Sequence, residues 1–222
     1  MIICIGDVLD PSKLEGIRAL AARGGFKDGR GTAGGAASTV KKVDQLPGTH
    51  PAYAEITAIV AEAVSRNEVV AASALPRLMS RLLISRAGPG MGYGPHADNA
   101  VMGDPPIRTD LAFTVFINDE DSYDGGELVV SDAQGDQVLK LPAGAMVLYP
   151  ATTIHRVNTV TRGERLVVVG WIQSLVRDPR VREMLLDLSI AERQLLETTG
   201  KGEAFDLIAK SRSNLLRLFA ET

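Results

Sequence analysis

The sequence is poor in cysteine and aromatic residues, and it contains no long hydrophobic run. Cys4 is the one cysteine among 222 residues, which excludes an internal disulfide and is typical of a reducing compartment. No apolar segment approaches the ~20 residues that a membrane-spanning helix needs. The opening residues, MIICIGDVLD, place no basic residue before their short apolar stretch, which predicts a first strand rather than a signal peptide. We therefore expect a cytoplasmic protein with no membrane partner.

A strong excess of charge of one sign is also lacking. The 24 Lys and Arg residues face 27 Asp and Glu residues, a net charge of -3, so nucleic-acid binding is not expected. Hydrophobic residues make up 45% of the chain and charged residues 23%, values that are typical of a globular protein and exclude a disordered one. The length suits one core domain with appended elements.

Helical spacing of apolar residues marks both ends of the chain. It predicts helices over residues 11–23 and 51–66, each with a proline in the first turn, where the missing N–H costs nothing. Two more helices are expected after Asp178-Pro179 and over residues 205–219. Residues 24–38 hold six glycines, which predicts a loop that is either a substrate lid or simply flexible.

Short β-rich runs separated by turn signals fill the middle of the chain: RLLIS, LAFTVFI, ELVV, QVLKL, AMVLY and RLVVVGWI. This spacing predicts an antiparallel sandwich or barrel rather than a parallel sheet. We expect a mainly β fold with flanking helices. It divides into an N-terminal support region (residues 1–77), a β core (78–174) and a C-terminal helical extension (175–222).

Three histidines are present, and two of them suggest a metal site. His96 and Asp98 would project to the same side of an extended backbone, and His155 would approach them from a distant strand. Two histidines and one carboxylate form the facial triad of non-haem Fe(II) oxygenases, which leaves three positions open on an octahedral ion. A single His-x-Asp triplet is weak by itself, and His155 is equally compatible with a capped strand end. His50, at a helix start, receives no role.

Arg165 opens an apolar strand, RLVVVGWI. We expect it to enter the barrel interior beside the strand that carries His155. A buried guanidinium is costly unless a carboxylate meets it, and its planar fork suits a dicarboxylate ligand. The alternative is a structural ion pair with Glu164, Asp110 or another acidic residue.

Together these residues resemble the Fe(II)/2-oxoglutarate dioxygenases related to prolyl 4-hydroxylase, and more closely the bacterial PKHD-type hydroxylases associated with iron uptake. Beyond the triad and Arg165, the resemblance rests on several segments spread over the chain: Ala74-Leu75-Pro76-Arg77, Arg108-Thr109-Asp110-Leu111, Ser122-Tyr123-Asp124-Gly125-Gly126-Glu127-Leu128, Leu141-Pro142-Ala143-Gly144, Leu148-Tyr149-Pro150 and Trp171-Ile172-Gln173-Ser174.

The resemblance implies a double-stranded β-helix (jelly roll) with iron(II) held by His96, Asp98 and His155. It implies Arg165 as the residue for the distal carboxylate of 2-oxoglutarate, with dioxygen as the oxidant and ascorbate as a reductant. Succinate and carbon dioxide would be released, and the hydroxylated substrate would be a peptidyl side chain or an iron-related small molecule. Trp171 either lines the pocket or packs in the core.

One position departs from the family pattern. Ala87 stands near the place where relatives often carry a tyrosine that binds the cosubstrate, so Tyr93 and Tyr149 become candidates for that contact. Two other classes of function remain open: a zinc hydrolase, which would not need a buried arginine, and a non-catalytic cupin-like binding module. The leucine-rich helices over residues 178–219 would either cap the barrel or join two copies into a homodimer.

Overall fold

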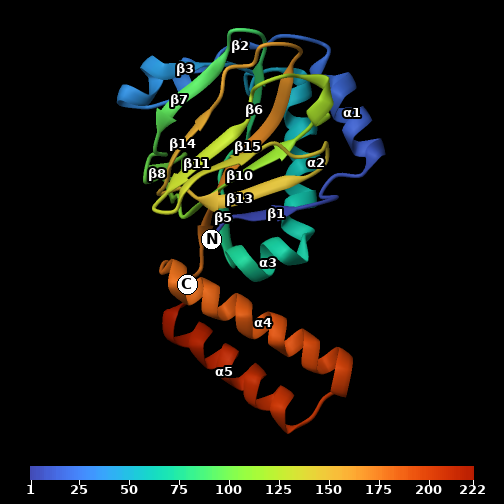
Figure 1. Ribbon diagram of the computed structural model, residues 1–222, viewed down its shortest axis with the longest axis vertical. Helices are drawn as coiled ribbons and strands as arrows, with labels where there is room; N and C mark the ends of the chain where they lie inside the picture. The colour runs from blue at the N-terminus through green and yellow to red at the C-terminus, as the bar shows by residue number, and fades with distance from the viewer.

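Two antiparallel sheets, facing each other, form the centre of the protein in a computed structural model that describes all 222 residues (Figure 1). The first sheet has eight strands in the order β1-β13-β10-β15-β6-β4-β2, with β5 paired to β15; the second has the order β12-β11-β14-β7-β3. This is the expected jelly-roll core.

The helices and strands follow one another along the chain as β1 (Ile3–Ile5), α1 (Pro11–Ala21), β2 (Lys27–Asp28), η1 (Gly29–Thr32), η2 (Gly35–Val40), β3 (Lys41–Lys42), β4 (Asp44–Gln45), α2 (Pro51–Arg66), α3 (Glu68–Ala74), β5 (Pro76–Met79), β6 (Leu83–Ala87), β7 (Gly92–His96), β8 (Val101–Met102), β9 (Ile107–Arg108), β10 (Leu111–Phe116), η3 (Glu120–Ser122), β11 (Leu128–Asp132), β12 (Gly135–Leu139), β13 (Met146–Pro150), β14 (Ile154–Val157), β15 (Arg165–Ser174), α4 (Pro179–Thr199) and α5 (Glu203–Phe219). The η elements are 3-10 helices.

The eight-stranded sheet is buried on both faces, because successive side chains of a strand alternate between them. On β10, Phe113 and Val115 pack against the helices, whereas Ala112 and Phe116 face the second sheet. This double burial explains why β10 reads as one continuous apolar run, LAFTVF. The side chains that face the second sheet line the cavity described below.

Helices α1 and α2 cover the outer face of the eight-stranded sheet (Figure 1). Ile17 and Ile56 are fully buried in the core that these helices share with the sheet. The Tyr53 hydroxyl of α2 donates a hydrogen bond of 2.6 Å to the carbonyl of Leu82, the residue before β6, and so holds α2 against the start of β6. None of the helices combines the length and hydrophobicity that crossing a membrane would require.

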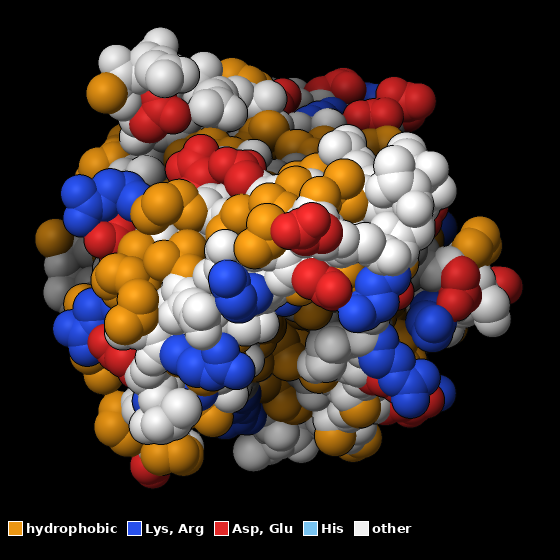
Figure 2. Space-filling model, turned by 90° about the horizontal axis from the view of Figure 1, so that it is seen from below, with side chains coloured by type: hydrophobic (Ala, Val, Ile, Leu, Met, Phe, Trp, Pro, Cys, Tyr) orange, Lys and Arg blue, Asp and Glu red, His pale blue; other side chains and the backbone are white.

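The C-terminal helices form a hairpin that projects away from the sheets (Figure 1). It is held by a small apolar cluster that contains Leu75, Val176 and Leu185, and by an ion pair of 2.7 Å between Arg108 and Glu221. Seen from the hairpin end, the surface shows patches of hydrophobic side chains among charged ones (Figure 2). The exposed apolar residues of the hairpin are Met184, Ile190, Leu196, Leu207, Leu218 and Phe219.

The sequence-based prediction of helices 11–23, 51–66 and 205–219, and of six central strands, is confirmed to within a few residues. Helix α3 and the short strands β2, β3, β4, β5, β8 and β9 were not predicted. The segment expected as a loop, residues 24–38, instead includes the 3-10 helix η1 and most of the 3-10 helix η2, and residues of both line the cavity. Gly29 makes this packing feasible, since a Cβ there would lie 2.8 Å from the carbonyl oxygen of Val43.

Gly170, in the middle of β15, is a packing requirement that can be tested. A Cβ at this position would lie 2.5 Å from a side-chain carbon of Leu82 and 2.6 Å from the ring of Phe113. We expect Gly170→Ala to lower the free energy of unfolding by about 1–3 kcal/mol, as overpacked cores do. Urea denaturation followed by circular dichroism measures this change.

Gly16→Ala is the matched control. Gly16 lies on the exposed side of α1, and a Cβ added there would have no neighbour within 4 Å, so alanine should stabilise the helix by about 0.5–1 kcal/mol. Equal effects of the two substitutions would contradict tight packing at Gly170.

Candidate functional site

A cavity between the two sheets gathers the polar residues that the sequence singled out. Its walls include His96, Asp98 and His155 from the second sheet and its flanking loop, and Arg165 and Trp171 from the first. Arg165 and Trp171 lie six positions apart on β15, so their side chains point to the same face of the sheet, which is the face that lines the cavity.

The pairing of β7 with β14 brings the two histidines together. His155 and His96 are direct partners in this antiparallel register, and their ring centroids lie 4.3 Å apart. Asp98 follows β7 by two residues and places Oδ1 at 3.7 Å from Nε2 of His155. One ligand atom from each of the three residues lies within 4.8 Å of the others, a spacing at which they could hold one metal ion. The sequence-based expectation that these three side chains converge is confirmed.

Both histidines are oriented by a backbone carbonyl two residues earlier in the chain. Nδ1 of His96 lies 2.8 Å from the oxygen of Gly94, and Nδ1 of His155 lies 3.0 Å from the oxygen of Thr153. A carbonyl only accepts hydrogen bonds, so Nδ1 carries the proton in each ring and donates it. The Nε2 lone pairs are therefore free to bind a metal, the arrangement found around metal-ligating histidines.

The electrostatics of the cluster also suit a cation. Burial, reinforced by the neighbouring His155, lowers the pKa of His96 to about 4, so its imidazole is neutral at physiological pH. Oδ2 of Asp98 is buried without any hydrogen-bond partner in the protein. An unsatisfied carboxylate oxygen is costly, and a divalent ion in the cluster would remove that cost. The donor set of two imidazoles and one carboxylate fits iron(II).

Two tyrosines frame the histidine pair. Tyr93 stacks on His96 with ring centroids 3.6 Å apart, and burial raises the pKa of its phenol to about 12. Tyr149 meets His155 edge-on at 5.2 Å, and its burial also raises its pKa. Both phenols therefore stay protonated at neutral pH and can donate a hydrogen bond into the cavity.

Arg165 is a buried cation without a carboxylate partner. Its residue is 4% exposed, its Nε has no hydrogen-bond acceptor, and burial lowers its pKa. The alternative of a structural ion pair with Glu164, Asp110 or another acid is wrong, because Arg165 forms no ion pair; Asp110 pairs with Arg108 at 2.7 Å and Glu164 pairs with Arg86 at 3.8 Å.

The predicted placement of Arg165 beside the strand of His155 needs correction. Strands β14 and β15 belong to different sheets, so Arg165 reaches the cavity from the opposite wall. The turn between the two strands crosses from one sheet to the other instead of forming a hairpin. The consequence is a cavity with imidazoles on one side and a guanidinium on the other.

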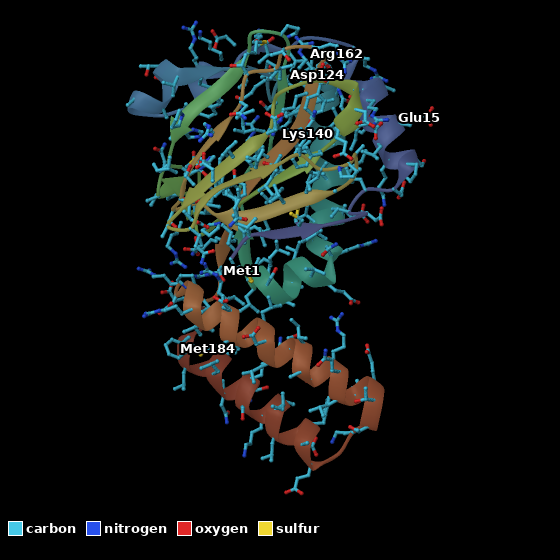
Figure 3. All side chains as sticks on the ribbon, viewed as in Figure 1. Met1, Glu15, Asp124, Lys140, Arg162 and Met184 are labelled. Carbon is cyan, nitrogen blue, oxygen red and sulfur yellow. The ribbon has the colours of Figure 1, made fainter.

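The Asp124-Gly125-Gly126 turn forms the floor under Arg165. Gly126 has a φ of +69°, and a Cβ there would lie 3.0 Å from Cδ of Arg165. Asp124 holds the turn in place through an ion pair of 2.7 Å with Arg162, and the two residues lie side by side at the end of the core (Figure 3). Glycine is thus required both for the backbone conformation and for the space that Arg165 occupies.

Several polar residues of the cavity were missed by the sequence analysis, among them Thr32, Lys41 and Gln45. They come from the N-terminal segment that pairs with β6 and β7. No local pattern distinguishes Lys41 from its exposed neighbour Lys42, because only the pairing of β3 turns one of them inward. Trp171 does line the cavity, and its Nε1 is buried without an acceptor.

Comparison with known proteins places this geometry among oxygenases. The family model described as the 2OG-Fe(II) oxygenase superfamily matches residues 82–173. A PKHD-type hydroxylase of Synechococcus sp. (strain JA-2-3B'a(2-13)) is 46% identical over 223 residues, covering 100% of both chains. A PKHD-type hydroxylase of Acaryochloris marina (strain MBIC 11017) is 46% identical over 221 residues, again with 100% of both chains covered.

Solved structures share the fold. A prolyl-4-hydroxylase of Pseudomonas putida matches with a TM-score of 0.56 and 18% identity, covering 78% of this chain and 92% of that chain. HygX of Streptomyces hygroscopicus, bound to nickel, 2-oxoglutarate and hygromycin B, matches with a TM-score of 0.54 and 13% identity, covering 79% of this chain and 84% of that chain.

Metal binding at the cluster can be measured without turnover. We expect Mn(II) to raise the melting temperature, because a ligand present at 100 times its Kd stabilises the native state by about 2.7 kcal/mol. Asp98→Ala should abolish the Mn(II)-dependent rise in differential scanning fluorimetry. Asp187→Ala, at an exposed position of α4, is the control and should keep it. A full rise in the Asp98 variant would show that the metal binds elsewhere.

Proposed function

The chain belongs to the PKHD-type hydroxylases of the 2OG-Fe(II) oxygenase superfamily, and we propose that His96, Asp98 and His155 hold its iron(II) while Arg165 binds the distal carboxylate of 2-oxoglutarate. The protein is thus an Fe(II)- and 2-oxoglutarate-dependent dioxygenase. The assignment of these residues rests chiefly on one observation: two oriented imidazoles, an unsatisfied carboxylate and an unpaired buried guanidinium share one cavity.

Iron(II), when bound, couples dioxygen to the decarboxylation of 2-oxoglutarate, which yields succinate, carbon dioxide and a hydroxylated substrate. The protein groups bind and orient the reactants. The Nε2 atoms of the two histidines and the carboxylate of Asp98 would hold the ion, and three protein ligands would leave room for the cosubstrate and dioxygen. The guanidinium of Arg165 can donate two parallel N–H bonds to a carboxylate, which fixes the direction of the cosubstrate across the cavity.

The surrounding residues exclude water and competing contacts. Leu128, Val167 and Val169 line the same cavity as the histidines and Arg165, so apolar side chains form part of its wall. A dry site strengthens each electrostatic contact and protects reactive species from water. We propose Tyr93 or Tyr149 as the second hydrogen-bond donor to the cosubstrate, in place of the tyrosine that Ala87 replaces, and Trp171 as a further pocket residue.

The other classes of function fit less well. A zinc hydrolase built on the same three ligands would need no anion at Arg165, so the buried charge of this side chain would stay unbalanced. A non-catalytic cupin-like module would not require oriented Nε2 lone pairs and an unsatisfied Asp98 oxygen. The family membership favours the oxygenase over both.

The family acts on small-molecule or peptide substrates. We propose a peptidyl side chain or an iron-related small molecule as the substrate, ascorbate as the reductant that keeps the iron ferrous, and the cytoplasm as the location. We further propose that residues 78–174 carry the chemistry, with residues 1–77 and 175–222 as supporting regions. Free Cys4 is consistent with a reducing compartment.

The decisive experiment combines spectroscopy with product detection. Anaerobic addition of Fe(II) and 2-oxoglutarate should produce a weak metal-to-ligand band in the visible range, and air should then release succinate by uncoupled turnover. His96→Ala should abolish both signals. Arg165→Ala should weaken 2-oxoglutarate binding by about tenfold or more, since a charge-assisted pair is lost. Unchanged affinity in the arginine variant would refute its assignment.

The glycine floor under Arg165 gives a finer test of the same contact. Gly126→Ala places a methyl group against Cδ of Arg165 and should weaken 2-oxoglutarate binding, while iron binding remains. Gly135→Ala is a matched control, because Gly135 also has a positive φ (+122°) but nothing within 4 Å of its Cβ position. Titration of the visible band measures both variants, and equal affinities would show that the floor does not position Arg165.

We propose that the C-terminal hairpin joins two copies of the chain. No residue of α5 is buried within the chain, although Leu207, Leu218 and Phe219 project from it. Sedimentation equilibrium should detect a dimer that Leu218→Glu converts to a monomer, whereas Val138→Glu, at an exposed position of the core, leaves it intact. A monomer in the unmodified protein would end this proposal.

A further inference from the structure

A buried lysine lies in the cavity wall, and the proposed reaction gives it no role. Lys41 is 4% exposed, although a free ammonium group is strongly hydrated. Its Nζ donates a hydrogen bond of 2.7 Å to the hydroxyl of Thr32, which in turn donates to Oε1 of Gln45 at 2.7 Å. These three side chains form a polar cluster on the N-terminal wall of the cavity.

The ammonium group of Lys41 has no partner of opposite charge in the protein. Asp28, which is close enough to influence it, is committed to Arg30 through a hydrogen bond of 2.8 Å. Asp98 also influences Lys41 but forms no ion pair with it, and its carboxylate belongs to the metal cluster. Burial outweighs both carboxylates and lowers the pKa of Lys41 to about 8.

Loading the site with its cofactors would leave this charge uncompensated. The two charges of iron(II) would be balanced by Asp98 and by the keto-acid carboxylate of 2-oxoglutarate. The distal carboxylate would balance Arg165. Lys41 alone would then remain as a buried cation without a counter-charge, which is an expensive arrangement unless a further anion enters.

The position of Lys41 suits contact with a substrate held beside the metal. Its Nζ lies 5.3 Å from the ring centroid of Tyr93, and Tyr93 stacks directly on His96. Lys41 is thus one aromatic ring away from the metal cluster. Gln45 adds a second donor, because its amide nitrogen makes no hydrogen bond within the protein while its oxygen is held by Thr32.

We propose that Lys41 and Gln45 bind a carboxylate of the primary substrate, so that the enzyme hydroxylates an acidic small molecule or a peptide that presents a carboxylate near the reacting C–H bond. This inference rests on the proposed function for its account of the other charges in the cavity. Lys41 is a specificity-determining residue, and Thr32 positions its ammonium group.

The test uses acetate as the probe and acetamide as its neutral counterpart. Trp171 is the one tryptophan of the chain and lines the same cavity, so its indole N–H signal in a 1H–15N spectrum reports on binding there. The protein is loaded with Zn(II) and 2-oxoglutarate, which fill the metal cluster and the Arg165 site without turnover. Acetate should shift the indole signal saturably, and acetamide should not.

Variants assign the effect to Lys41. Lys41→Gln should weaken acetate binding by about tenfold or more, because a charge-assisted hydrogen bond is lost. Lys41→Arg, which keeps the charge, should retain more of it. Lys42→Gln, at the exposed neighbouring position, is the matched control and should bind acetate as the unmodified protein does. Circular dichroism confirms that each variant is folded.

Two outcomes would overturn the inference. Unchanged acetate binding in Lys41→Gln would show that the lysine is only structural. Loss of 2-oxoglutarate affinity in Lys41→Gln, to the extent seen with Arg165→Ala, would make Lys41 a residue of the cosubstrate site. Failure of the proposed function is distinguishable, since the unmodified protein would then give no visible band with Fe(II) and 2-oxoglutarate. A repeat of the acetate titration with metal-free protein would still show whether Lys41 binds the anion.

Discussion

The antiparallel register between β7 and β14 is the constraint on which the site depends. It sets His155 opposite His96, and each ring is then turned by a carbonyl from its own chain segment, Gly94 or Thr153. A shift by one residue would send one imidazole to the other face of the sheet. Gly92 permits this pairing, because a Cβ there would lie 2.9 Å from the carbonyl oxygen of Val157 on β14.

The cavity is unusual in holding more positive charge than its own carboxylate can balance. Arg165 and Lys41 are buried on different walls, and Asp98 is the one carboxylate that lines the cavity with them. Such an interior is unfavourable for the empty protein and favourable for one filled by a divalent metal with acidic ligands. The two buried cations therefore lower the folding stability of the empty protein, as is common where side chains are arranged to bind a ligand.

Much of this site could be predicted from the sequence because its residues have local signatures. The His96-x-Asp98 triplet, the Asp124-Gly125-Gly126 turn and Arg165 at the head of an apolar strand are each visible within a few residues. Their meeting in one place followed from the resemblance to a known family, since no local pattern fixes the distance between His96 and His155. The apolar runs predicted an antiparallel sandwich or barrel, because buried strands such as β10 read as continuous apolar segments, whereas the jelly-roll topology itself was implied by the resemblance.

What the sequence did not reveal depends on contacts between distant segments. Strands β3 and β4 have two residues each, too few for a periodic pattern, and exist because β6 and β7 offer them an edge. The inward direction of Lys41 follows from that pairing alone. The assignment of β14 and β15 to separate sheets was missed because a turn signal between two strands does not reveal whether the chain returns to the same sheet.

Hydrogen bonds and ion pairs around Asp110 connect the C-terminal hairpin to the β core. Asp110 accepts hydrogen bonds from Arg108 and from the backbone N–H of Ser174, the last residue of β15. Arg108 also donates a hydrogen bond to the carboxylate of Glu221. Strand β15 begins with Arg165 at its other end. The attachment of the residues that follow α5 and the position of the last residue of β15 therefore depend on the same buried carboxylate, that of Asp110.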